Sequence, residues 1–245
     1  MSDWLFDLGN TRLKCAPLHV DGGIGEVVAL AHDAPDLAAE LARALPARGE
    51  VAYVASVAAG PLKLDLLDAL TQRFERIAIA RTTHRFAGLR IAYANPDKLG
   101  VDRFLAMLGA LAREDGPWLL AGVGTALTID LLDRDGTHRG GRIAPSPALM
   151  REALHERAAQ LPARGGDYVE FADDTEAALA SGCEGAALAL VERSLREATA
   201  HLARVPKLLL HGGGADSLRA HLPAGEFAPC LVLEGLARWA RVESA

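Results

Sequence analysis

The same short plan occurs twice along this chain, and it constrains the fold more than any other feature. An apolar run over residues 4–8 precedes the polar turn Gly9-Asn10-Thr11 and a second extended run. An apolar run over 118–123 likewise precedes Gly124-Thr125 and a further extended run. Apolar runs joined by glycine-containing turns predict β-hairpins. We therefore expect two halves of similar topology that meet near the tetrapeptide Glu114-Asp115-Gly116-Pro117.

Helical and extended segments alternate over the rest of the chain. Leu37, Leu41 and Leu45 recur every four residues, which is typical of a helix with one apolar face. Ser146 and Pro147 are suited to the N-cap and the first turn of another helix. The expected helices cover residues 36–45, 60–74, 97–113, 148–161, 173–204 and 235–242, and the expected strands cover 4–8, 12–20, 51–57, 76–80, 118–123, 127–132, 207–211 and 231–233. This alternation indicates an α/β protein with mixed sheets.

The composition excludes several classes of protein. Half of the 245 residues are hydrophobic, which is enough to bury a substantial core. The formal net charge is −6 and the basic residues are scattered, so we expect no nucleic-acid surface. The three widely spaced cysteines, Cys15, Cys183 and Cys230, fit neither a disulfide framework nor a paired zinc site. Without a signal-like start or an apolar run of ~18 residues, the chain is expected to be cytoplasmic and not membrane-spanning.

The stretch FDLGNTRLK, from Phe6 to Lys14, combines a carboxylate, a flexible turn and a cation. Gly9 allows a ligand to approach the backbone closely, and the N–H groups of the turn can donate to phosphate oxygens, whose charge Lys14 can neutralise. Asp7 is suited to a hydrated Mg²⁺ ion, which proteins hold through one or two carboxylates. Taken alone, the stretch is better explained as an ordinary turn, because no GxxxxGK motif is present.

A second stretch, YANPDKLGVDRF, places charged residues at the expected start of a helix. A helix N-terminus and Arg103 together favour a nearby anionic group. Asp102 could accept a proton from a substrate hydroxyl, and Arg103 could bind a carboxylate through two parallel hydrogen bonds. The alternative is an exposed acid and base in a first helical turn.

Further glycine-containing turns lie in the second half of the chain. Gly124-Thr125 could contact phosphates from the side opposite Gly9; alternatively, these are two independent turns, and Asp130 simply faces solvent. The glycines that follow His211 either admit a flat ring to the backbone or form a plain turn. The remaining histidines show no ligand spacing and are mostly expected in turns or on the surface. No HExxH or GxSxG motif supports a zinc protease or a hydrolase.

Five segments taken together resemble the type III pantothenate kinases: DLGNTRLK, LGVDR, GTALTID, GGRI and DDTEAALASGCEG. They occur in the family's order and spacing over almost the whole chain. The resemblance implies an actin-like ATPase fold of two ribonuclease-H-like halves, residues 1–115 and 116–245, with ATP between them. It also implies a homodimer that uses ATP with Mg²⁺ to phosphorylate the primary hydroxyl of pantothenate, the first step of coenzyme A synthesis.

The resemblance also assigns roles to individual residues. It gives Asp102 the role of proton acceptor, and it makes Thr175 a pantothenate contact that in this family can come from the partner subunit. Residues matching the ATP site are Asp7, Leu8, Gly9, Asn10, Thr11, Arg12, Leu13, Lys14 and Thr125, and residues matching the pantothenate site are Tyr93, Gly100, Val101, Asp102, Arg103 and Thr175.

Two positions depart from the family's pattern. The family's aspartate for a monovalent cation, K⁺ or NH₄⁺, stands two residues before the Gly-Thr turn, where this chain has Gly122. We therefore expect weak or absent activation by potassium. Pro145-Ser146 replaces a Pro-Gly pair, so that loop is expected to differ in shape. The alternative function is a non-catalytic transcriptional accessory protein of the same fold, against which Asp7 and Asp102 argue.

Overall fold

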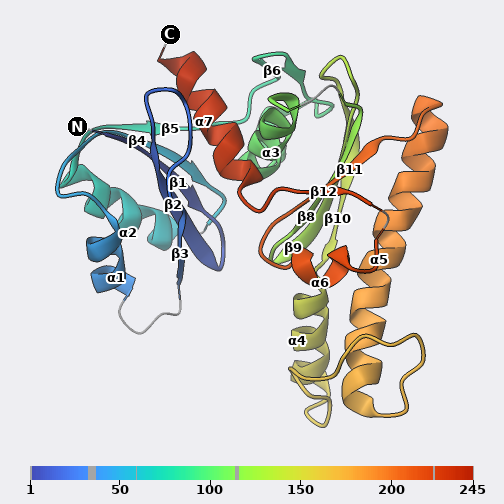
Figure 1. Cartoon of the computed structure of the whole chain (residues 1–245). Coiled ribbons are helices and arrows are strands. Elements are labelled where there is room, and N and C mark those ends of the chain that lie inside the picture. Colours follow the sequence, from blue (N-terminus) through green and yellow to red (C-terminus); the bar gives the residue numbers. More distant parts are fainter. Residues whose placement is uncertain (1, 33–36, 59, 114–115, 223, 245) are drawn as a thin grey trace. The chain divides into compact units, whose positions relative to one another are not determined.

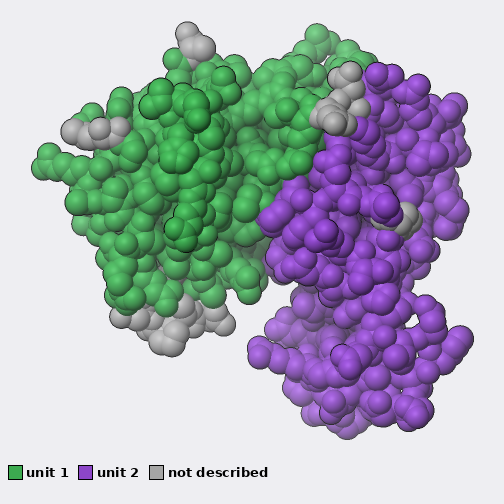
Figure 2. All heavy atoms as spheres, viewed as in Figure 1, with its two compact units in different colours: residues 1–115, 135–137, 230–245 green, residues 116–134, 138–229 purple. Residues whose placement is uncertain are grey.

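The computed structural model of this chain describes residues 2–32, 37–58, 60–113, 116–222 and 224–244. These residues form two compact units, shown in Figure 2. Unit 1 comprises residues 1–115, 135–137 and 230–245, and unit 2 comprises residues 116–134 and 138–229. The end of the chain therefore belongs to the same unit as its beginning. Glu114 and Asp115, where the two halves were predicted to meet, lie outside the described residues.

Unit 1 is built on a five-stranded mixed sheet of order β3-β2-β1-β4-β5 (Figure 1). β1 pairs antiparallel with β2 and parallel with β4, so the predicted N-terminal hairpin forms the sheet's antiparallel side. Its strands are β1 (Asp3–Leu8), β2 (Arg12–Leu18), β3 (Val28–Ala31), β4 (Gly49–Ser56) and β5 (Phe74–Ile79), with a two-stranded ribbon of β6 (Arg85–Phe86) and β7 (Leu89–Arg90). Its helices are α1 (Leu37–Ala44), α2 (Gly60–Thr71), the 3-10 turn η1 (Pro96–Lys98), α3 (Val101–Leu111) and α7 (Leu231–Glu243).

The two faces of the unit 1 sheet have different partners. Phe6, Leu8 and Cys15 belong to an apolar cluster with residues of α2, such as Leu66. Because side chains alternate along a strand, the residues between them point to the opposite face. On that face Tyr53 of β4 packs its ring against a tryptophan of α7, with ring centroids 6.3 Å apart. The face that carries the odd-numbered residues of β1 is therefore the one covered by α3 and α7.

Helices α3 and α7 pack closely because glycines lie at their contact. A Cβ atom added to Gly109 would lie 2.6 Å from the carbonyl oxygen of Leu231, and one added to Gly235 would overlap the backbone of Leu105. Near the end of α3, Arg113 donates to Glu234 of α7 at 2.7 Å. These contacts fix α3 against α7 and so fix the start of α3, where Asp102 lies.

Unit 2 repeats the topology of unit 1. Its sheet has the order β10-β9-β8-β11-β12, with antiparallel pairing from β8 to β10 and parallel pairing from β8 to β12. Its strands are β8 (Trp118–Val123), β9 (Ala126–Leu132), β10 (His138–Pro145), β11 (Lys207–His211) and β12 (Glu226–Phe227), and its helices are α4 (Pro147–Arg157), α5 (Thr175–Leu202) and α6 (Ala215–Arg219). The prediction of an α/β fold with two similar halves is confirmed.

Helix α5 extends well beyond the sheet of unit 2 and packs there against α4 (Figure 1). Ser146 caps α4 by accepting a hydrogen bond from the N–H of Leu149 at 3.2 Å. Asp174 caps α5 by accepting from Ala177 at 2.9 Å. Both caps agree with the sequence prediction. In the part of the chain that the structure describes, no helix is both long enough and apolar enough to span a membrane.

Several predicted elements differ from the structure. The strand predicted over 231–233 is the first turn of α7, because a short apolar run fits a buried helix as well as a strand. The single helix predicted over 97–113 is divided into η1 and α3, with Gly100 as the N-cap of α3. Phe74 begins β5 rather than ending α2. The helix predicted to reach residue 161 ends at Arg157.

Candidate active site

Asp7, Lys14 and Asp102 come together on one face of the unit 1 sheet. Asp7 and Lys14 lie directly opposite each other in the register of β1 and β2. Asp102 lies in the first turn of α3, which packs over the same face, and its charge acts on Asp7. Burial and, second, the charge of Asp102 raise the pKa of Asp7 from 3.8 to about 7, while Lys14 acts to lower it. Two carboxylates and one ammonium group thus share this face.

The turn after β1 is held by backbone hydrogen bonds. The N–H of Gly9 donates to the carbonyl of Arg12 at 3.0 Å, and the N–H of His32 donates to Thr11 at 3.0 Å. Asn10, Thr11 and Arg12 are exposed, whereas Leu13 is buried in the sheet. The turn therefore presents its polar residues to solvent directly beside the Asp7–Lys14 pair, as a phosphate-binding turn requires.

The segment before α3 orients Arg103. Nη1 of Arg103 donates to the hydroxyl of Tyr93 at 3.2 Å, and the guanidinium lies 5.8 Å from the centre of the same ring. Arg103 is only 5% exposed. The alternative of an exposed base is therefore wrong for Arg103. A Cβ atom on Gly100 would lie 2.5 Å from Oδ1 of Asp102, so the carboxylate can fold back over the helix start only because residue 100 is a glycine.

In unit 2, two glycine-containing turns lie at the carboxyl ends of the adjacent parallel strands β8 and β11. Gly124 and Thr125 are exposed, and the N–H of Gly124 donates to Ala126 at 2.9 Å. The turn after β11 lies against them, since the N–H of Gly214 donates to Val123 at 2.9 Å. Gly212 has a φ of +91°, which a residue with a side chain rarely adopts. The carboxyl edge of a parallel sheet is a common ligand site.

A pocket of about 510 Å³ opens beside this edge. Its walls include Val123, Gly124 and Gly214 from the two turns, Ser146 at the start of α4, and Arg151. Nη2 of Arg151 donates to the carbonyl of Gly165 at 2.7 Å. The wall also carries Arg164 and the carboxylates of Glu152 and Glu184. The pocket thus combines glycine backbone, a helix N-terminus and side chains of both charges, a set suited to a polar ligand. Sequence reasoning missed Arg151, whose only signal was its position one turn after a predicted N-cap.

Gly122 is enclosed by polar side chains. A Cβ atom there would lie 2.6 Å from Cε1 and 2.7 Å from Nε2 of His211, and 2.8 Å from Oγ1 of Thr128. The position expected from family resemblance to carry a cation-binding carboxylate therefore has neither the carboxylate nor room for it. The residues present do not fit a monovalent cation held by an aspartate at this position.

Asp130 and His138 form a buried pair on β9 and β10. Nε2 of His138 lies 3.0 Å from Oδ1 of Asp130, and the two residues are 1% and 3% exposed. The alternative that Asp130 faces solvent is wrong, and His138 departs from the expected surface position. The pair was not foreseen because β10, which pairs with β9 and carries His138, contains Gly140-Gly141 and was not predicted as a strand. No group of three or more histidine, cysteine or acidic residues suited to a metal occurs in the part of the chain that the structure describes.

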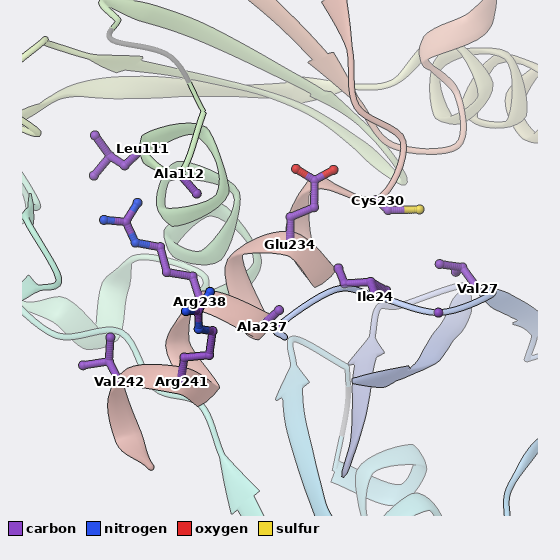
Figure 3. A pocket seen from close by; sticks show the side chains of 12 residues that line it. Ile24, Val27, Leu111, Ala112, Cys230, Glu234, Ala237, Arg238, Arg241 and Val242 are labelled. Carbon is purple, nitrogen blue, oxygen red and sulfur yellow. The ribbon is translucent and has the colours of Figure 1, made fainter. Parts of the chain in front are cut away.

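A larger pocket, of about 1000 Å³, lies in unit 1 between α7, the end of α3 and the loop after β2 (Figure 3). Arg238 on its wall donates to the carbonyls of Ala87 at 2.9 Å and Leu108 at 3.3 Å, and Glu234 is paired with Arg113. These charged groups serve contacts within the fold, so we assign no ligand to this pocket.

The remaining predicted residues are divided between the units. Thr175 is exposed and is the first residue of α5, next to the capping Asp174. It belongs to unit 2, as does Thr125, whereas Tyr93 and Asp102 belong to unit 1. The contacts described above therefore unite Asp7, Lys14 and Asp102 and join Tyr93 to Arg103, but they do not connect these residues to Thr175.

Comparison with known proteins gives one consistent result. A sequence model of the type III pantothenate kinase family matches residues 4–197. Type III pantothenate kinases from Stenotrophomonas maltophilia strain K279a and Xanthomonas axonopodis pv. citri strain 306 are 59% and 58% identical to this chain, over 98% and 100% of both chains.

Among solved structures, a protein from Campylobacter jejuni assigned to the Baf family of transcriptional activators has a TM-score of 0.62 at 17% identity over 98% of both chains. A ROK family glucokinase from Streptomyces griseus has a TM-score of 0.51 at 11% identity, over 99% of this chain and 100% of its own. At these identities the two structures show the fold alone, which is that of the actin-like ATPases predicted above.

Proposed function

This chain belongs to the type III pantothenate kinase family, and on that premise we propose how its residues carry out the family's reaction. The reaction is the ATP-dependent phosphorylation of pantothenate at its primary hydroxyl, the first step of coenzyme A synthesis. One observation carries the proposal: Asp7, Lys14 and Asp102 converge on one face of the unit 1 sheet. Phosphoryl transfer depends mainly on positioning and on charge neutralisation, and this face supplies groups for both.

Asp102 is the proposed proton acceptor for the pantothenate hydroxyl. It lies in the first turn of α3, where the helix N-terminus carries partial positive charge. Gly100 leaves room for the carboxylate to turn back over the helix start. A carboxylate held in this way can accept the proton that the hydroxyl loses as it attacks phosphorus.

Asp7 and Lys14 are the proposed partners of the ATP phosphates and their metal. Lys14 neutralises phosphate charge, and the turn from Leu8 to Leu13 supplies backbone donors. When bound, Mg²⁺ neutralises charge that develops on the phosphates. Asp7 fits such an ion held through water: its raised pKa results from burial and from a neighbouring carboxylate, and a cation opposes both effects.

Arg103 is the proposed ligand of the pantothenate carboxylate. The hydrogen bond to Tyr93 and the contact with its ring restrict the plane of the guanidinium. A restricted guanidinium loses little entropy when it binds a carboxylate through two parallel hydrogen bonds. The buried Val101 supports the same turn of α3 from the apolar side.

In unit 2, we assign Thr125 to the phosphates of ATP and the pocket beside it to the rest of the nucleotide. Gly124 and Gly214 in its wall allow close approach of a ligand to the backbone. Ser146 at the start of α4 and Arg151 add polar partners. By this assignment, residues 1–115 carry the first phosphate loop and the pantothenate segment, and unit 2 carries the second phosphate loop.

We also propose that the protein is a homodimer that associates through α4 and α5. An apolar groove of about 610 Å³ runs between these helices, lined by Leu149, Met150 and Leu154 among others. Leu154 is 42% exposed, and Phe171 in the loop before α5 is fully exposed. Exposed apolar surface of this kind favours a protein interface. Thr175 begins α5 beside this surface, which supports its assignment to pantothenate bound by the partner subunit.

Asp102→Asn tests the assignment of the base. We expect turnover in a coupled assay of pantothenate-dependent ATP consumption to fall by about 10²–10⁴-fold, the usual contribution of a positioned base. Calorimetry should show that ATP and pantothenate still bind. Asp97→Asn is the matched control, because Asp97 is an exposed carboxylate five residues away. Turnover near that of the wild type would show that Asp102 is not the base, and a wild-type protein that consumes no ATP with pantothenate would favour the regulatory alternative.

A further inference from the structure

Gly122, Thr128 and His211 lie side by side on one face of the unit 2 sheet. Gly122 of β8 is paired with His211 of β11 on one side and with Thr128 of β9 on the other. Their sequence neighbours, such as Ala121, Ile129 and Leu210, belong to the apolar core beneath α5. Because side chains alternate, the three residues point to the opposite face of the sheet. That face therefore carries an imidazole and a hydroxyl over a glycine.

The imidazole and any side chain at residue 122 exclude each other. The position that a Cβ atom of residue 122 would take lies within 2.8 Å of Nε2 and Cε1 of His211 and of Oγ1 of Thr128. Non-bonded atoms do not approach this closely, so a larger residue at 122 requires the ring of His211 to leave. The absence of a side chain at Gly122 is therefore what allows the ring of His211 to occupy this position.

This arrangement lies at the edge that the proposed function assigns to ATP. His211 is the last residue of β11, and Gly212 to Gly214 follow it; Gly122 is two residues before Gly124. A carboxylate that binds a monovalent cation is neutral as a unit and attracts oxygen atoms through the cation. A glycine brings no carboxylate charge to this place, and a ring N–H group of the imidazole attracts oxygen atoms as a donor.

We propose that His211, seated on Gly122 beside Thr128, takes the place of a carboxylate-held monovalent cation, so that this kinase needs neither potassium nor ammonium. The proposal rests on the proposed function, since it concerns the edge of unit 2 that binds ATP. His211 is a positioning residue in this account: it fills the space and offers a fixed polar group, and it does not itself react. If the ring of His211 only filled space, it would need no polar atom, and its removal would not change how turnover depends on the cation.

The test compares the wild type with His211→Ala and with the double variant Gly122→Asp/His211→Ala, which restores a carboxylate and removes the ring that excludes it. His201→Ala is the matched control, because His201 is an exposed histidine on α5. Pantothenate-dependent turnover is measured in potassium, sodium and choline chloride at equal ionic strength. The thermal unfolding midpoint is measured in the same salts without substrates.

We expect equal wild-type turnover in the three salts and a loss of at least about tenfold in His211→Ala, as for loss of a fixed polar group at a reacting phosphate. The double variant should regain turnover selectively in potassium and unfold at a higher temperature in potassium than in sodium. Strong potassium activation of the wild type, or wild-type turnover by His211→Ala in sodium, would overturn the proposal.

Failure of this inference and failure of the kinase assignment give different results in the turnover and unfolding measurements. A wild-type protein without turnover in any salt would refute the kinase assignment. The unfolding midpoints would still decide the inference: a midpoint that potassium raises over sodium only in the double variant supports it, and one that potassium raises equally in the wild type contradicts it.

Discussion

Asp7→Asn is expected to stabilise the metal-free protein at alkaline pH while it removes kinase activity. Burial first, and the charge of Asp102 second, raise the pKa of Asp7 from 3.8 to about 7. The folded state therefore binds this proton more tightly than the unfolded state does. The contribution of Asp7 to the free energy of unfolding is therefore fully present below pH 3.8 and is lost as the pH rises through about 7.

The size of the effect follows from the two pKa values. Each pH unit between them removes about 1.4 kcal/mol, so the ionised Asp7 opposes folding by at most about 4 kcal/mol above pH 7. Asp7 is half-buried, so water can screen its charge. We therefore expect asparagine to raise the free energy of unfolding by about 1–2 kcal/mol at pH 8.5, with an effective dielectric nearer to 20 than to 4.

The assay is urea unfolding with EDTA at pH 5 and pH 8.5, for the wild type and Asp7→Asn. Glu75→Gln is the control, because Glu75 is exposed on β5. The free-energy difference between Asp7→Asn and the wild type should widen from pH 5 to pH 8.5, and the control should show no such change. An Asp7→Asn protein that is less stable than the wild type at pH 8.5, or a difference independent of pH, would refute the reasoning.

Three further predictions concern packing. Gly100→Ala should displace the carboxylate of Asp102 and lower kcat by about 10–100-fold, as expected for a misplaced reacting group, whereas Gly60→Ala, which meets no atom within 4 Å, should not. An unchanged kcat in Gly100→Ala would show that the carboxylate tolerates displacement. Gly235→Ala should lower the free energy of unfolding by about 1–3 kcal/mol, measured in urea against the same control, because its methyl group overlaps the α3 backbone. Equal stability of both alanine variants would contradict the close packing of α3 and α7. Leu154→Glu should shift the protein to monomers in sedimentation velocity, and a persistent dimer would exclude α4 from the interface.

The elements that sequence predicts well are those fixed by neighbouring residues. Ser146 and Asp174 cap helices through hydrogen bonds that span three residues, so local sequence is sufficient to place them. The first turn of α7 was missed because Leu231 and Leu233 form a short apolar run, and the helix that they begin packs against α3, far away in sequence. Local patterns thus determine where helices start, whereas tertiary contacts decide the identity of short apolar runs.

The same division applies to the candidate site. A hairpin whose turn centres on Asn10 and Thr11 places Asp7 opposite Lys14, so the pair follows from sequence alone. Asp102 joins them only because glycines let α3 approach α7, and that contact leaves no signal near residue 102. The enclosure of Gly122 by His211 is equally invisible in sequence, because the two residues are brought together by the parallel pairing of β8 and β11.

The cluster of Asp7 and Asp102 is best explained by function, because its charges oppose folding. A hydrophobic residue at position 7 would extend the apolar face that Tyr53 and α7 already cover. Instead the chain places a half-buried carboxylate beside a second one, and the single ammonium of Lys14 does not restore its ordinary pKa. Perturbed carboxylates of this kind occur where a ligand supplies the missing charge. A metal ion bound with ATP at the proposed site would supply it, so the folding free energy lost at Asp7 would be recovered when the nucleotide binds. Metal-bound nucleotide should then bind more tightly than the free nucleotide.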